Sequence, residues 1–334
     1  MNKPKIITFG EILIRLSPPS NKRFSQSPTL EIHYGGAEGN VAASLSKFGL
    51  NVEMVSALPH HEYADEAIKF LKGHNVGTKY ILRQEGRMGV YFVEGANMHR
   101  GGKVIYDRTE SCFTNLQLED LDWDEIFEGA TWFHWSGITP AVSENAALLC
   151  EQAILKANEM GLQVSMDYNF RAKLWKWGKS DTEVMPKLMK GCHVMSGIHP
   201  DFDVLKEEIP DEEFAKSADK LMSENPKCKI VVFSSRGVYS ASHHTWQGVL
   251  YDGKKVYRST KYELTHIVDR VGGGDAFMAG IIYGLNTSEN LQEVIDFATA
   301  SSTLKHGIEG DFNDVALEEV YQLMQAEGGA KVSR

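Results

Sequence analysis

Residues 268–280 read VDRVGGGDAFMAG. The three consecutive glycines, Gly272, Gly273 and Gly274, have no Cβ, so the chain can turn sharply and direct several backbone N–H groups at one point before a helix begins. That point suits phosphate oxygens, and Asp275 could take the proton from a hydroxyl group that attacks phosphorus. The stretch therefore indicates a small-molecule kinase. A plain tight turn, with an aspartate favoured by the helix dipole, would explain the same residues.

On the N-terminal side of this stretch, β-rich runs alternate with helical patterns. The runs cover residues 5–9, 52–57, 131–135, 163–167, 193–196 and 229–234, and the helical patterns cover 37–48, 63–74, 143–159, 181–189 and 211–223. This alternation predicts an α/β fold with a mostly parallel central sheet and helices on both faces. Helices are also expected at 275–283, 291–305 and 315–325. Because no repeat or low-complexity linker interrupts the chain, residues 1–334 are predicted to form a single domain.

Two regions, about residues 12–35 and 87–110, break the alternation. Their strand-like runs at 30–34, 88–93 and 103–107 have no following helix, so they cannot easily join a parallel sheet. We expect them to form a small separate β-sheet, placed beside the strand ends, that acts as a lid. Residues 238–243 and 248–258 are expected to form hairpin strands near the edge of the main sheet.

Composition excludes several classes of partner. The net charge of −10 and the pI near 5.7 repel phosphate, so nucleic acid and anionic membranes are not expected as partners, and an anionic ligand needs a local basic pocket. The run at 6–16 is interpreted as a buried strand instead of a signal peptide, and no apolar run approaches a membrane span of about 20 residues. The four cysteines form no C-x-x-C pair, which indicates reduced thiols in a cytoplasmic protein.

Side chains suited to a sugar occur near the predicted lid. Gly36 would admit a ligand close to the backbone, and the amide of Asn40 can both donate to and accept from a hydroxyl group. Tyr106 and Arg108 are two residues apart on one strand and so share a face, and Tyr91 lies on the neighbouring run. Two phenols and a guanidinium suit a polyhydroxylated anion. A helix cap and a solvated edge strand are the structural alternatives.

Two further groups follow predicted strands of the main sheet. Asp167, Asn169 and Arg171 alternate at the carboxyl end of an apolar strand, which is where open α/β sheets bind their ligands. The stretch SSRG at 234–237 follows another strand and could border a nucleotide phosphate, with Ser235 and Gly237 as the expected nucleotide contacts, although a plain turn explains it equally well. The adjacent histidine pairs in the chain lack the spacing of a metal site.

These motifs together resemble the ribokinase-like, or PfkB, carbohydrate kinase family over nearly the whole chain. The two family signatures match GGAEGN at 35–40 and DRVGGGD at 269–275. Within the family, GEILIRLS at 10–17, VIYDR at 104–108, DYNFR at 167–171, and residues 304–306 with 310–312 resemble 2-keto-3-deoxygluconate kinases. The resemblance implies a ribokinase-like three-layer sandwich with a β lid, ATP and Mg²⁺ as cofactors, Asp275 as the catalytic base and the glycines at 272–274 as its anion hole.

The resemblance also implies phosphorylation of the 6-hydroxyl of 2-keto-3-deoxygluconate. The keto acid would be surrounded by Gly36, Tyr91, Tyr106, Arg108 and Arg171. Arg15 stands near the place where many fructokinases and ribokinases carry an aspartate, which counts against a neutral sugar. Residues 198–201 fall on the family's N-x-x-E motif, where Asp201 keeps the acidic end and could hold magnesium through water.

The lid of such kinases often mediates dimerisation, so a homodimer or a higher homo-oligomer is expected. Two other readings remain open. One is a kinase of this family for a neutral sugar such as fructose or ribose. The other is a sugar-binding protein whose catalysis is impaired, since the amide of the N-x-x-E motif is absent. A nucleoside kinase would need an aromatic base pocket in place of Arg108 and Arg171.

Overall fold

The computed structural model describes residues 4–197 and 209–325. Within these ranges, ten strands form one large sheet. In sheet order they are β13 (Val256–Arg258), β12 (His244–Tyr251), β11 (Ile230–Val238), β10 (Val194–Ser196), β9 (Gln163–Asp167), β8 (Ala130–Ser136), β1 (Lys5–Phe9), β4 (Asn51–Pro59) and β5 (Gly77–Gln84), and β14 (Tyr262–Leu264) pairs with β12. The strands from β11 to β5 are parallel, whereas β12 is antiparallel to β11 and to its other two partners.

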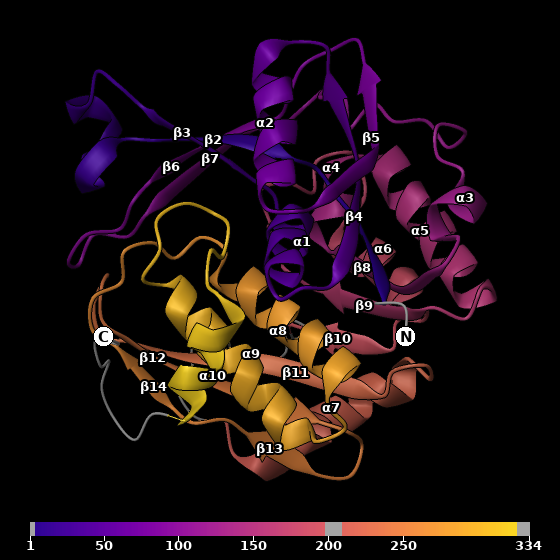
Figure 1. Ribbon diagram of the computed structural model, residues 1–334, viewed down its shortest axis with the longest axis vertical. Helices are drawn as coiled ribbons and strands as arrows, with labels where there is room; N and C mark the ends of the chain where they lie inside the picture. Colours follow the sequence, from indigo (N-terminus) through magenta and orange to yellow (C-terminus); the bar gives the residue numbers. More distant parts are fainter. Residues whose placement is uncertain (1–3, 198–208, 326–334) are drawn as a thin grey trace.

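Helices cover both faces of this sheet (Figure 1). One face packs against α1 (Ala37–Lys47), α2 (Glu62–Gly73), α8 (Gly273–Thr287), α9 (Leu291–Lys305) and α10 (Leu317–Gln325). The other packs against α3 (Trp123–Phe127), α5 (Glu144–Glu159), α6 (Asp181–Met189) and α7 (Asp211–Glu224), and α4 (Ile138–Val142) connects β8 to α5. Each face has its own cluster of buried apolar side chains. The predicted three-layer α/β architecture is therefore confirmed.

A second, four-stranded sheet lies apart from the large one, at the upper left of Figure 1. Its order is β3 (Glu31–Gly35), β2 (Leu13–Ser17), β6 (Val90–Glu94) and β7 (Lys103–Asp107), and we call it the lid sheet. In the register of β2, β6 and β7, Arg15 lies opposite Tyr91 and Tyr91 lies opposite Tyr106, so these three side chains share one face. The separate β layer expected from the sequence is present.

The run at 6–16 forms two strands, and its interpretation as one buried strand is wrong. The chain leaves the large sheet after β1 and enters the lid sheet at β2. Gly10 lies at the break, where a Cβ would come within 2.0 Å of the Glu38 carboxylate. Glu38 is buried and accepts hydrogen bonds from β8 and α4, so it cannot move aside. The apolar run is therefore divided by a residue from α1.

The hairpin expected at 238–243 is also displaced. The strand β11 continues to Val238, and residues 239–243 form the turn, in which the backbone N–H of Tyr239 donates to His243 O at 3.0 Å. The returning strand β12 begins at His244 and ends at Tyr251, so the run at 248–258 is divided between β12 and β13.

The cysteines of the described chain are all free and buried. Among the helices within 4–197 and 209–325, none combines the length and the apolar character needed to cross a membrane.

Candidate active site

The glycine turn directly precedes α8. Gly272 has φ of +82°, and a Cβ at this residue would come within 2.1 Å of the backbone oxygen of Asp311. Only glycine fits both the left-handed backbone and this close approach. The helix begins at Gly273, so the positive end of its dipole lies at the turn. The N–H of Gly273 donates to Arg270 O at 3.4 Å, and the anion hole expected at 272–274 stays a prediction.

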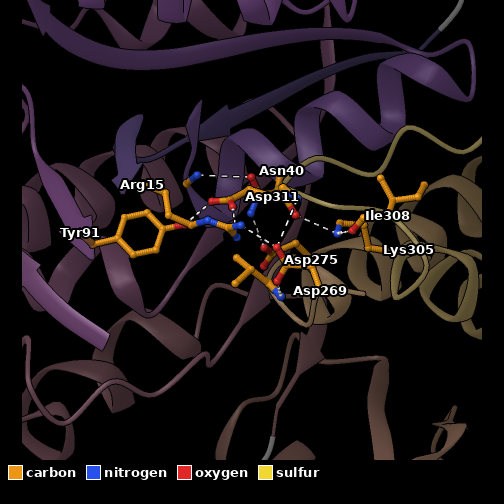
Figure 2. Close-up of polar contacts among 11 residues, drawn as sticks. Arg15, Asn40, Tyr91, Asp269, Asp275, Lys305, Ile308 and Asp311 are labelled. Atoms are coloured by element: carbon orange, nitrogen blue, oxygen red, sulfur yellow. Dashed lines mark hydrogen bonds and ion pairs between the residues drawn. The ribbon is translucent and has the colours of Figure 1, made fainter. Parts of the chain in front are cut away.

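Asp275 lies in the first turn of α8 with 8% of its surface exposed. Its Oδ2 accepts a hydrogen bond of 2.6 Å from Asn40 Nδ2 on α1 (Figure 2). Burial raises the pKa of Asp275 to about 6, against the opposing effects of the Asn40 hydrogen bond and the Arg171 charge. This pKa leaves the carboxylate largely ionised near neutral pH and able to accept a proton.

Asn40 is itself held by the backbone that precedes α1. Its Oδ1 accepts from the N–H of Gly36 at 3.3 Å, while its Nδ2 donates to Asp275. A Cβ at Gly36 would come within 2.1 Å of the backbone oxygen of Glu11. Asn40 was predicted to contact a sugar hydroxyl, but in this structure its amide orients the carboxylate of Asp275.

A cavity of about 630 Å³ opens beside Asp275, a size typical of small-molecule sites. Its lining includes nearly every side chain predicted for substrate binding and catalysis. These residues are Gly36, Asn40, Tyr91, Tyr106, Arg108, Arg171, Gly272, Gly273, Gly274 and Asp275. The lining comes from the lid sheet, the carboxyl ends of the central strands and the start of α8.

Arg171 and Asp167 line the same cavity as Asp275. Burial, helped by the charge of Asp275 and opposed by the charge of Arg171, raises the pKa of Asp167 to about 7. The Arg171 guanidinium donates to the backbone oxygen of Phe170 at 2.9 Å, and no carboxylate of the described chain forms an ion pair with it. Its charge nevertheless acts on Asp167 and Asp275, because it lowers the pKa of both carboxyl groups.

Arg108, unlike Arg171, forms an ion pair with a carboxylate. Its Nε donates to Glu11 Oε2 at 2.7 Å, and both side chains are buried. The charge of Arg108 is thus compensated within the protein, although its side chain lines the cavity. The sequence did not reveal this pair because its members are 97 residues apart.

Basic side chains gather on the other side of the glycine turn. Arg236 and Arg270 line the cavity there together with His306 and Trp246. Arg270 donates to backbone oxygens of the turn at 239–243, including Ala241 O at 3.1 Å from Nε. Burial, helped by the charges of Lys305, Arg236 and Arg270, lowers the pKa of His306 to about 4, so this ring is neutral.

The nucleotide residues expected from the sequence lie beside this cluster. Ser235 and Gly237 are on β11, where the described lining of the cavity instead includes Ser234 and Arg236. The alternation of side chains along a strand explains this shift by one residue. The assignment of Ser235 and Gly237 to the nucleotide stays a prediction, and Asp201 lies outside the described residues.

The fold, the carboxylate beside the glycine turn and the cavity lined by both the lid sheet and the central strands together define a kinase that acts on a small hydroxyl compound. The sequence pattern of the pfkB family carbohydrate kinases matches residues 3–313. The chain belongs to this family and is a carbohydrate kinase.

Similar proteins include sugar-acid kinases. A 2-dehydro-3-deoxygalactonokinase of Haloferax volcanii is 30% identical over 331 residues, which cover 99% of each chain. The crystal structure of 2-dehydro-3-deoxygluconokinase from Thermotoga maritima is 38% identical and has a TM-score of 0.91, covering 97% of this chain and 100% of that one. A PfkB family carbohydrate kinase from Listeria grayi is 32% identical with a TM-score of 0.89, covering 96% and 100%.

Proposed function

We propose that the protein transfers the terminal phosphoryl group of ATP to the 6-hydroxyl of 2-keto-3-deoxygluconate. The observation that carries this proposal is the guanidinium of Arg171, which lines the same cavity as Asp275 and forms no ion pair with a carboxylate of the described chain. A neutral sugar gives this charge no partner, whereas the carboxylate of a sugar acid does. The similarity to kinases named for 2-dehydro-3-deoxy sugar acids supports the same substrate class.

Asp275 would act as the general base in this reaction. Its carboxylate would accept the proton of the 6-hydroxyl while that oxygen attacks the phosphoryl group. The N–H groups at the start of α8 and the helix dipole would stabilise the negative charge on the transferring group. Asn40 would hold the carboxylate in place, because its 2.6 Å hydrogen bond fixes Oδ2.

The basic cluster of Arg236 and Arg270 would receive the phosphates of ATP, the nucleotide that PfkB kinases use. Magnesium fits the oxygen donors of the cavity, because Asp167 offers a hard carboxylate oxygen there while Asp275 stays free to act as the base. Bound Mg²⁺ would neutralise charge on the phosphates. The contribution of Asp201 remains part of this proposal.

We further propose that two copies of the chain associate through the outer face of the lid sheet. An apolar row crosses this face in register on β3, β2, β6 and β7, formed by Ile32, Leu16, Phe92 and Ile105. Ile32 and Ile105 are 44% and 52% exposed. This row points away from the face that carries Arg15, Tyr91 and Tyr106, so association would leave the cavity lining intact.

A coupled assay of ADP release tests the substrate. The panel contains 2-keto-3-deoxygluconate, its C4 epimer 2-keto-3-deoxygalactonate, fructose and ribose. We expect kcat/KM to be highest for a keto acid and to fall by about tenfold to 150-fold in Arg171→Ala, the range of a charged hydrogen bond. The loss on fructose should be much smaller, and it reflects only the effect of the Arg171 charge on the pKa of Asp275. Equal losses on both substrates would refute the carboxylate assignment, and binding without turnover would favour a sugar-binding protein.

A further inference from the structure

Arg15 joins the lid sheet to the main body of the protein. It is on β2, only 3% exposed, and its guanidinium reaches two carboxylates at once (Figure 2). Nη1 donates to Asp311 Oδ2 at 2.7 Å, and Nη2 donates to Asp269 Oδ2 at 2.6 Å. A planar guanidinium can hold two acceptors in fixed directions, which an ammonium cannot do. Arg15 is not among the described residues that line the cavity.

Both residues also contact the glycine turn, Asp269 through its carboxylate and Asp311 through its backbone. Asp269 Oδ1 accepts from the N–H of Val271 at 3.1 Å. The backbone oxygen of Asp311 lies against Gly272, where it would be 2.1 Å from a Cβ. The two residues that bind Arg15 therefore contact the turn at which the proposed function places the phosphoryl group. A shift of the Arg15 guanidinium would be transmitted to this turn.

A second buried cation closes the same network. Lys305 is fully buried, and its Nζ donates to the backbone oxygens of Ile308 at 3.0 Å and Gly310 at 2.9 Å. These bonds fix the loop that leads to Asp311, and the N–H of Gly310 in turn donates to Asp269 Oδ2 at 3.2 Å. Two buried cations, Arg15 and Lys305, thus lie beside the buried carboxylate of Asp311 and the partly buried carboxylate of Asp269. Loss of one cation would leave unpaired negative charge beside the turn.

Tyr91 connects this network to the sugar side of the cavity. Its hydroxyl donates to Asp311 Oδ1, while its ring lines the cavity and stacks on Tyr106 with centroids 6.4 Å apart. A ligand that packs against the Tyr91 ring therefore contacts a residue bonded to the same carboxylate as Arg15. The lid sheet has two attachments to Asp311, one from β2 and one from β6.

We propose that Arg15 is a positioning residue that couples sugar binding at the lid sheet to nucleotide binding at the glycine turn. Sugar and nucleotide then bind with positive coupling, because each stabilises the lid position in which the Arg15 guanidinium donates to both Asp311 and Asp269, an arrangement we call the Arg15 fork. This inference rests on the proposed placement of the sugar acid on the lid side and of the phosphates at the turn.

The test measures the affinity of a non-hydrolysable ATP analogue by calorimetry, with Mg²⁺, in the absence and presence of saturating 2-keto-3-deoxygluconate. In the wild type, sugar should tighten analogue binding by about tenfold, within the usual 5–150-fold range of coupling. In Arg15→Lys, which keeps the charge and loses the fork, the ratio should fall below about twofold, while affinity for the analogue alone changes little. A merely structural defect would weaken both measurements together.

The matched control is Arg87→Met. Arg87 is also a lid-region arginine in a 2.7 Å ion pair, with Asp107, but this pair is exposed and far from the turn in the hydrogen-bond network. Its coupling ratio should equal that of the wild type. A wild-type ratio near one, or an unchanged ratio in folded Arg15→Lys, would overturn the proposal.

If circular dichroism shows that Arg15→Lys does not fold, Tyr91→Phe provides the second measurement. It removes the hydroxyl that donates to Asp311, and its ratio should fall at least about twofold. An unchanged ratio in Tyr91→Phe would also refute the coupling. If the wild type does not bind the keto acid, the proposed substrate fails instead, and the same ratios are measured with the sugar of the panel that is phosphorylated.

Discussion

Substitution of Asn40 by alanine should move the pH dependence of the reaction in a direction fixed by the structure. Asn40 donates a 2.6 Å hydrogen bond to Asp275, and this bond lowers the pKa of the carboxyl, which burial raises to about 6. A base must be deprotonated to act, so wild-type kcat/KM should fall as the pH drops through about 6. Without the bond the pKa rises further, and the acid limb should move toward higher pH.

The magnitude follows from the class of hydrogen bond. A bond to a charged group is worth about 1.5–3 kcal/mol, and 1.36 kcal/mol corresponds to one pKa unit, so the pKa of Asp275 should rise by about one to two units. With a pKa near 7.5, about 9% of the base would be ionised at about pH 6.5, against about 76% in the wild type. The loss of activity from ionisation alone should thus be about eightfold at that pH and should vanish near pH 9.

The measurement is kcat/KM of wild type and Asn40→Ala with the preferred sugar of the panel, between about pH 5 and 9.5. Asn158→Ala is the matched control, because Asn158 also donates from a half-buried amide, but to the backbone oxygens of Ile154 and Gly191 on the far side of the sheet. Its profile should superimpose on that of the wild type. An acid limb that stays in place in Asn40→Ala, with activity reduced equally at every pH, would show that Asp275 is not the titrating base.

Two further predictions concern the turn and the lid. Gly272→Ala should lower kcat by about a hundredfold and reduce the free energy of unfolding by about 1–3 kcal/mol, because φ is +82° and the Cβ would meet Asp311 O. Steady-state kinetics and denaturant titration measure these two effects, and Gly73→Ala is the control because a Cβ at Gly73 meets open space. Wild-type turnover in Gly272→Ala would contradict the prediction. Ile105→Glu should convert a dimer to a monomer, measured by sedimentation velocity. The control is Leu155→Glu, which should leave the dimer intact, because Leu155 lies on α5 and is 63% exposed. A dimer that survives Ile105→Glu would exclude the apolar row as its interface.

The sequence predicts the elements whose local signals agree with their final contacts. The strand at 163–167 and the helix at 291–305 have the predicted bounds, because apolar runs there end at turn-forming residues. The strand β5 was missed because its sequence, GTKYILRQ, mixes polar and apolar residues at the edge of the sheet. The division of 6–16 was missed because it depends on Glu38, whose position is fixed by the tertiary structure.

The site was predictable where a residue lies in a motif and was not where the fold creates the contact. Asp275 and Arg171 line the cavity as expected, because one follows the glycine turn and the other follows a strand end. The stretch 234–237 was expected to border a nucleotide phosphate, but the sequence did not indicate that Ser234 and Arg236 would line the cavity, because this depends on β11 continuing to Val238 through pairing with β12. Likewise, nothing local in the sequence indicates that Arg15 binds Asp269 and Asp311 instead of a sugar.

The compensation of charge bears on how a chain of net charge −10 could attract ATP and, under the proposed function, a sugar acid. Arg15 and Arg108 each form ion pairs with carboxylates of the protein, so they contribute structure and little field. Arg171 and Arg270 bond to neutral backbone oxygens, and neither forms an ion pair with a carboxylate of the described chain. Both line the cavity that contains Asp275. Under the proposed function, Arg171 would attract the carboxylate of the sugar acid and Arg270 would attract the phosphates of ATP.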